Sequence, residues 1–259
     1  MSLSDRSPEA MFGDGLRQIL LDRERGAAVL LHQALVWLGD HPGALSLGNR
    51  EATLRTLRRT RPEMSGFASL ASRLELESSN LEDPGAVLRD LMGRLDADET
   101  RLVDNAVACL NTLGVRRVIT LSSSSSVAAA LEARAEKIET VHVLESLPGG
   151  EGRELAKRLG KTLADVRLHA DDELAAVVDA ADTGVIGADS VFPDGSVLNK
   201  VLSAELGRLL DRAGKPLLVL TTSWKNAEPG AGTRDAEGFE IVPARWITRV
   251  VTECPTERR

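Results

Sequence analysis

Short apolar runs that alternate with polar loops and helical stretches fill the chain after Gly114, and this pattern restricts the fold more than any other feature. The runs that fit buried strands are residues 117–121, 141–144, 166–168, 184–187 and 217–220. Stretches of helical character separate them at 127–131, 154–159, 173–178 and 201–212. Short apolar strands that alternate with helices are typical of a parallel sheet covered by helices on both faces.

Before Gly114, apolar residues recur at helical spacing and strand-like runs are absent. The predicted helices are centred on 16–20, 27–38, 54–59 and 67–76. A fifth begins at Asp83-Pro84, where Asp can cap and Pro suits the first helical position, and it continues to Gly114. We therefore predict an α/β protein with a helical N-terminal domain (1–114) followed by a Rossmann-like parallel-sheet domain (115–259).

The composition favours a soluble, cytoplasmic protein without a membrane segment. The net charge is −7 and aromatic residues make up 3% of the chain, whereas nucleic-acid binders usually carry a basic excess, so no direct nucleic-acid binding is expected. The longest apolar stretch, 27–38, is too short to span a membrane. Cys109 and Cys254 form no disulfide framework, which fits a reducing compartment. No metal is expected, because no histidine has metal-ligand spacing: His32, His41, His142, His169.

Polar residues follow several predicted strands, at the sheet edge where parallel sheets bind ligands. Ser122 to Ser126 lie between a strand and a helix start. Free backbone N–H groups there would bind phosphate, but serine also caps helices in ordinary polar loops, and the pattern fits both. The glycine-rich segment 148–152 is neither a P-loop nor a dinucleotide fingerprint, and a tight turn is the commoner use of such a sequence.

An acidic and a basic residue also follow the apolar run 185–187 and the turn after it. Asp189 comes directly after the run, where a buried carboxylate is costly without a partner or a catalytic task. Lys200, next to Asn199, would suit a phosphoester if it faced the serine loop. A capping Asp and a solvated Lys are the alternatives, and the spacing favours neither.

Seven motifs in order resemble the family that joins the alpha, beta and delta subunits of eukaryotic translation initiation factor 2B to two isomerases, which act on methylthioribose-1-phosphate and ribose-1,5-bisphosphate. The motifs are Arg25-Gly26-Ala27, Thr60-Arg61-Pro62, Thr120 to Val127, Glu145 to Gly152, Gly187-Ala188-Asp189, Asn199-Lys200 and Val242 to Glu253. The resemblance spans nearly the whole chain.

The resemblance implies an aldose–ketose interconversion of a phosphorylated pentose, with a Cys of the first-strand loop and the Asp of Gly-Ala-Asp as the acid/base pair. No metal or other cofactor is implied, and the protein would be a homodimer through its C-terminal domain. On this chain the catalytic positions are Asp189 and Ser122. The implied phosphate- and sugar-binding residues are Arg25, Gly26, Ala27, Arg61, Ser123, Ser124, Glu151, Asn199 and Lys200.

Three positions depart from the family pattern. Ser122 stands at the position of the catalytic Cys, Leu121 at that of the preceding His, and Leu147 at that of a common Arg. A hydroxyl is far less acidic than a thiol and needs an activator, and none is evident nearby in the sequence. We therefore rank first a protein that binds a phosphorylated sugar or nucleotide, with isomerase catalysis lost or weakened. A working sugar-phosphate isomerase comes second, and a translation factor subunit third.

Overall fold

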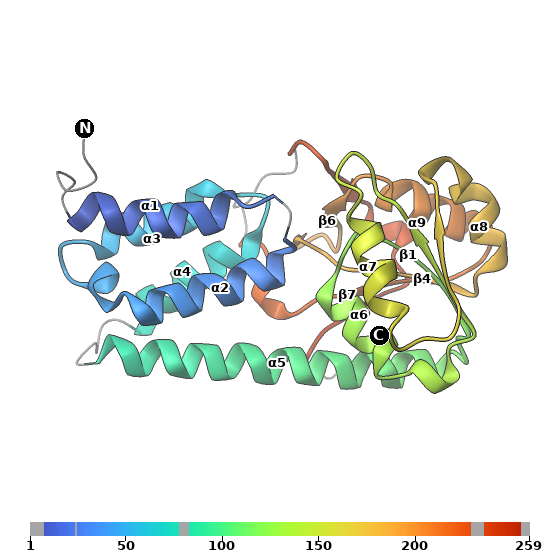
Figure 1. Ribbon diagram of the computed structural model, residues 1–259, viewed down its shortest axis with the longest axis horizontal. Coiled ribbons are helices and arrows are strands. Elements are labelled where there is room, and N and C mark those ends of the chain that lie inside the picture. The colour runs from blue at the N-terminus through green and yellow to red at the C-terminus, as the bar shows by residue number, and fades with distance from the viewer. Residues whose placement is uncertain (1–7, 24, 78–82, 229–235, 255–259) are drawn as a thin grey trace.

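A helical region and an α/β region lie end to end along the long axis of the molecule (Figure 1). The computed structural model describes residues 8–23, 25–77, 83–228 and 236–254. The fold predicted from the sequence is confirmed in both regions.

Five helices build the helical region, and their leucine-rich faces form its core. They are α1 (Pro8–Leu21), α2 (Ala27–Asp40), α3 (Arg50–Thr60), α4 (Ser65–Glu77) and the first half of α5 (Pro84–Thr112). The predicted stripe of α2 is buried as a set: Ala27, Leu30, Leu31, Ala34, Leu35, Leu38. The remaining faces of α2 are at least partly exposed, so burial of this stripe is what docks α2 on its neighbours.

The helix α5 belongs to both regions (Figure 1). Asp83 caps it by accepting a hydrogen bond from the backbone N–H of Ala86 at 3.1 Å, as the sequence predicts. Leu88, Leu91 and Leu95 pack in the core of the helical region. Leu102 and Leu110, further along the same helix, pack in a core beside the sheet. The predicted domain boundary at residue 114 falls just after a helix that both cores share.

Six parallel strands form the main sheet, in the order β3-β2-β1-β4-β7-β9. They are β1 (Arg117–Leu121), β2 (Thr140–Leu144), β3 (Val166–His169), β4 (Thr183–Ile186), β7 (Leu217–Leu220) and β9 (Arg249–Val251). Counted along the chain, this order is 3-2-1-4-5-6, which is the order of a doubly wound nucleotide-binding sheet.

Helices cover both faces of this sheet. The second half of α5, α6 (Ser125–Glu132) and α7 (Glu151–Leu159) pack on one face. On the other face lie α8 (Leu174–Ala180) and α9 (Ser203–Arg212). The predicted helix 201–212 begins at Ser203, because the backbone of Leu202 adopts a left-handed conformation with φ of 75°.

A small antiparallel sheet, which the sequence did not predict, extends the α/β region toward the helices. Its strands, in the order β5-β6-β8, are β5 (Ser190–Val191), β6 (Val197–Lys200) and β8 (Phe239–Val242). It places Lys200 on a strand rather than in a loop, beside its partner Phe239 on β8. The backbone N–H of Ser65 on α4 reaches the carbonyl of Asp189, which connects this part of the chain to the helical region.

Candidate functional site

A cavity of about 240 Å³ lies between the helical region and the α/β region. On the sheet side it opens at the carboxyl ends of β1 and β4, the point where the strand order reverses. Ligands of doubly wound sheets bind at this point. Every site residue predicted from the sequence lines the cavity: Arg25, Gly26, Ala27, Arg61, Ser122, Ser123, Ser124, Glu151, Asp189, Asn199 and Lys200. The structure thus brings the predicted set together, while the role of each residue stays a prediction.

Cationic side chains outnumber acidic ones in the described cavity lining, although the chain has a net charge of −7. Among the described residues, the lining cations are Arg23, Arg25, Arg61, Arg158, Lys200 and Lys225, and the lining acids are Glu151 and Asp189. Arg23, Arg158 and Lys225 were not among the site residues predicted from the sequence. An excess of cations in a concave site raises the local potential and attracts anions.

The serine loop after β1 caps a helix, as one of the two alternatives expects, and it also lines the cavity, while phosphate binding by the loop stays a prediction. Ser124 caps α6 by accepting from the N–H of Val127, and the last two serines lie within α6. Ser122 has a φ of 58°, which is uncommon for a residue other than glycine. The Oγ of Ser146 accepts a hydrogen bond from the N–H of Ser122 at 2.6 Å and so holds this conformation.

The glycine-rich segment 148–152 forms the tight turn that the sequence favours. A Cβ atom at Gly152 would lie 1.8 Å from the carbonyl oxygen of Leu144, so this glycine lets α7 approach β2. The absence of a side chain at Gly152 therefore serves the packing of α7 against β2. Its neighbour Glu151, the first residue of α7, does line the cavity and pairs with Lys200, with 2.6 Å between Oε1 and Nζ.

Asp189 is buried, with 8% of its surface exposed, yet no described residue donates a hydrogen bond to its carboxylate. Its backbone is held by β6, because its N–H donates to the carbonyl of Leu198 at 2.9 Å. Burial raises the pKa of the Asp189 carboxyl, and the positive charges of Lys225, Lys200 and Arg61 oppose this shift. A buried carboxyl without a partner in a cavity is a common mark of a functional group.

Lys225, in the loop after β7, lines the cavity together with Asp189. Its side chain is also 8% exposed, and Nζ donates to the carbonyl of Ala188 at 2.7 Å. Burial lowers the pKa of the Lys225 amine, against the charges of Asp189 and Glu99. The one feature of the sequence that could have indicated Lys225 is its position after a buried strand, because the predicted site residues Ser122 and Asp189 also follow buried strands.

Arg61 has a structural task in addition to lining the cavity. Its Nη1 donates to the carbonyl oxygens of Leu20 at 3.2 Å and Asp22 at 2.7 Å, and so caps the end of α1. Its Nε pairs with Glu63. Arg25 is more exposed and contacts the carboxylate of Asp22, with 3.4 Å between Nε and Oδ2. Of the two arginines, Arg25 is the freer to turn toward a ligand.

The described residues contain neither a cluster of potential metal ligands nor a membrane-spanning helix. Among the side chains that the structure describes, no three His, Cys, Asp or Glu residues come together as a metal site requires. No helix in the same part of the chain is long and apolar enough to cross a membrane. His142 and His169 lie on adjacent strands with 3.0 Å between Nδ1 and Nε2, outside the cavity lining.

The model of the "Initiation factor 2 subunit family" matches residues 51–229, which is more than half of the chain. A ribose 1,5-bisphosphate isomerase from Haloferax volcanii is 28% identical over 238 residues, which cover 78% of this chain and 72% of that protein.

Two solved structures show the same fold. The translation initiation factor eIF-2B from Pyrococcus horikoshii OT3 superposes with a TM-score of 0.77 at 19% identity, over 96% of each chain. A chain of the tetrameric eIF2B-beta2-delta2 complex from C. thermophilum gives a TM-score of 0.75 at 18% identity, over 97% of this chain and 92% of that one.

Proposed function

Since this chain belongs to the initiation factor 2 subunit family, we propose that it binds a phosphorylated sugar or nucleotide in the cavity between the helical region and the sheet. The observation that carries this proposal is the excess of cations in the cavity lining of an acidic protein. The N-terminus of α6, capped by Ser124, adds backbone N–H groups that suit a phosphate. The Haloferax volcanii relative, an isomerase of a ribose bisphosphate by its name, supports the sugar-phosphate class.

The proposal includes loss or weakening of thiol-dependent isomerase catalysis. Ser122 supplies a hydroxyl where the resemblance implies a thiol, and its Oγ has no hydrogen-bonded base among the described residues. Cys109 lies on α5 and packs in the core beside the sheet, away from the cavity lining. No described cysteine lines the cavity to replace the missing thiol.

Calorimetric titration with ribose 1,5-bisphosphate and with nucleoside monophosphates tests the binding. The wild-type protein is expected to bind at least one of these ligands. Arg25→Met and Lys200→Met are each expected to weaken that binding about 10- to 100-fold, because each removes a charge-assisted contact. Arg55→Met, which removes an exposed arginine paired with Glu51 on α3, is the control. Equal affinities for all three variants would place the ligand elsewhere.

A working isomerase is the second candidate, and the unpartnered carboxyl of Asp189 favours it. Ser122→Cys is expected to raise isomerisation of ribose 1,5-bisphosphate about tenfold or more, because a thiol is a far better proton-transfer group than a hydroxyl. Adding Asp189→Asn is expected to abolish that gain. A coupled assay for the ketose product measures both effects. Wild-type turnover that survives Asp189→Asn would contradict the assigned roles.

We also propose that the protein is a cytoplasmic homodimer associated through its α/β region. The support is that a related structure is an assembly of several chains, named as a beta2-delta2 tetramer. Light scattering coupled to size-exclusion chromatography is expected to give twice the 27.8 kDa of one chain. A stable monomer across micromolar concentrations would contradict this proposal and would leave the binding proposal intact.

A further inference from the structure

Two buried ionisable groups line the cavity, Asp189 after β4 and Lys225 after β7. We propose that Lys225 is a catalytic residue that exchanges a proton with the carbon chain of the bound sugar phosphate, opposite Asp189, and so takes the part of the thiol that Ser122 lacks. This inference rests on the proposed binding of a phosphorylated sugar in the cavity.

The sheet itself brings the two groups together. The strands β4 and β7 are parallel neighbours, with Ile186 opposite Val219, so the residues after both strands lie at one edge. The hydrogen bond from Lys225 Nζ to the carbonyl of Ala188 then places the amine next to the residue that precedes Asp189. Both side chains are more than nine-tenths buried, and both line the cavity.

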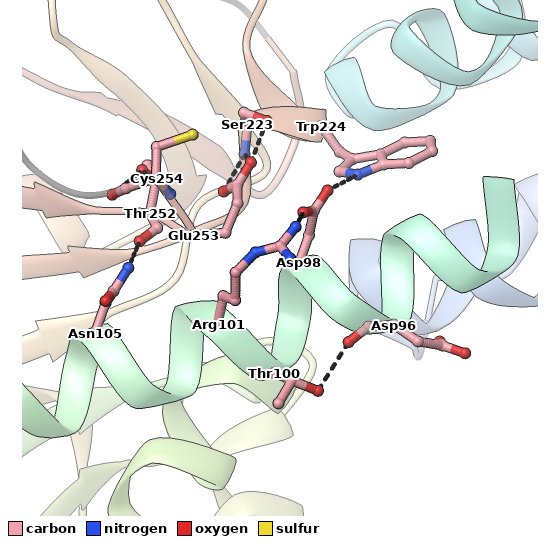
Figure 2. A network of polar contacts seen from close by, with 10 residues as sticks. All are labelled: Asp96, Asp98, Thr100, Arg101, Asn105, Ser223, Trp224, Thr252, Glu253 and Cys254. Atoms are coloured by element: carbon pink, nitrogen blue, oxygen red, sulfur yellow. Dashed lines mark hydrogen bonds and ion pairs between the residues drawn. The ribbon is translucent and has the colours of Figure 1, made fainter. Parts of the chain in front are cut away.

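The loop that carries Lys225 is fixed on both sides. Trp224, in the short helix η6 (Ser223–Lys225), is fully buried in the core of the helical region, and its Nε1 donates to Asp98 on α5 at 2.9 Å. Ser223 donates from its backbone N–H to the carboxylate of Glu253, at 2.9 Å from Oε2, and its hydroxyl also contacts that carboxylate. Figure 2 shows these contacts around the loop. A lysine held this firmly loses little freedom when it acts on a substrate.

Asn105 on α5 strengthens the same attachment, because its Nδ2 donates to the carbonyl of Thr252 at 2.8 Å, next to Glu253 (Figure 2). This hydrogen bond connects α5 to the segment that directly follows β9, next to the loop that carries Lys225. Positioning of Lys225 thus involves a buried indole, a carboxylate and an amide from three separate parts of the chain.

The charges that face the pair suit proton exchange. Burial raises the pKa of the Asp189 carboxyl and lowers the pKa of the Lys225 amine. Each group is the charged neighbour that most opposes the other's shift; Lys200, Arg61 and Glu63 also act on Asp189, and Glu99 on Lys225. Shifts in these directions bring the pKa values of the two groups closer together, so that proton transfer between either group and a substrate costs less free energy.

The proton movements balance without an oxidant or a reductant. The Lys225 amine removes the proton from C2 of the sugar. In an open-chain aldose, the Asp189 carboxyl gives its proton to the carbonyl oxygen on C1. In a ring-closed 1-phosphate, it gives its proton to the ring oxygen as the bond between that oxygen and C1 breaks and the ring opens. An enediol or its phosphate ester results. The Lys225 ammonium then returns a proton to C1, and the Asp189 carboxylate takes the proton of the C2 hydroxyl. The product is the ketose, and both groups regain their starting forms.

The test measures binding and chemistry separately on the full chain, with ribose 1,5-bisphosphate and ribose 5-phosphate as probes. Titration calorimetry gives the affinity, and NMR in D2O gives deuterium uptake at C1 and C2 together with ketose formation. Lys225→Arg keeps a long basic side chain but supplies no base at neutral pH, because the guanidinium stays protonated. We expect it to bind within about threefold of wild type and to lose about 100-fold or more of the exchange and turnover.

Further variants distinguish loss of the Lys225 amine from a general loss of folded structure. Lys225→Met is expected to show the same loss of exchange and turnover, with the circular dichroism spectrum of a folded protein. It tests the role of the amine if the larger arginine side chain cannot be accommodated in the buried site. Exchange in Lys225→Ala is expected to recover on addition of methylamine, which a merely structural lysine would not show. Lys215→Met removes a lysine that also donates to backbone carbonyls, those of Val178 and Asp179, and it should retain binding and exchange.

The outcomes separate this inference from the proposed function. Wild-type protein that binds a probe but neither exchanges nor isomerises it would overturn the role of Lys225 and leave the binding proposal standing. Undiminished exchange in both Lys225→Arg and Lys225→Met would do the same. Wild-type protein that binds neither probe would overturn the sugar-phosphate proposal and this inference with it.

Discussion

Trp224→Ala is expected to lower the free energy of unfolding by about 3–5 kcal/mol, the range for a large aromatic side chain removed from a core. Trp224 has no exposed surface, although it comes from a loop of the α/β region and lies in the core of the helical region. The substitution also removes the hydrogen bond to Asp98 and the contact with the Arg73 guanidinium, 4.0 Å from the ring centroid. Urea denaturation followed by circular dichroism measures the loss.

Trp246→Ala is the matched control, because Trp246 is only partly buried and belongs to none of the three large cores. It is expected to lose clearly less stability than Trp224→Ala, since less apolar area is exposed to water. Equal losses in the two variants would show that Trp224 does not anchor the helical region. A fold that survives Trp224→Ala is also expected to bind sugar phosphate more weakly, because Lys225 is the next residue in the cavity lining.

Arg61→Met is expected to cost about 3–5 kcal/mol of stability, the penalty for removing one partner of a buried ion pair. Arg61 is 8% exposed, and its loss leaves Glu63 without its cation. It also leaves the carbonyl oxygens of Leu20 and Asp22 without the donor that caps α1. Thermal and urea unfolding of the purified variant give the change in the free energy of unfolding.

Arg55→Met serves as the comparison for Arg61→Met, since both remove one arginine from the same stretch of chain. Arg55 is half exposed and pairs with Glu51 one turn away on α3. Its loss is expected to change stability by no more than about 0.5 kcal/mol, as is usual for exposed pairs. If Arg61→Met proved as mild as Arg55→Met, the guanidinium would not cap α1 and would be free to serve a ligand alone.

Much of the fold and of the cavity could be predicted from the sequence because the signals are local. The stripe of α2 repeats at helical spacing, and the buried strands β1, β4 and β7 are short apolar runs bounded by polar loops. Parallel strands end at a common edge, so residues far apart in the sequence, such as Ser122 and Asp189, were expected to be close. The cavity lining agrees with that expectation.

The rest depended on pairings that no local pattern encodes. The strands β6 and β8 lie about forty residues apart, mix polar with apolar residues, and pair with Asn199 opposite Glu240. Lys225 follows a tryptophan in an irregular loop, and only the tertiary structure shows that Trp224 points into one core while the lysine faces the cavity. Two residues adjacent in the sequence are thus buried in different environments, and only the tertiary structure determines this.

The continuous helix α5 fixes the width of the cavity. At 29 residues and 1.5 Å per residue it is a rod about 44 Å long, with one half embedded in each core. To swing the helical region away from the sheet, this rod would have to bend sharply or lose turns, which costs backbone hydrogen bonds and buried leucines at once. The arginines on one wall of the cavity and the serine loop on the other are therefore held at a constant separation. If the proposed phosphorylated ligand binds in the cavity, we expect this constant separation to discriminate ligands by their length.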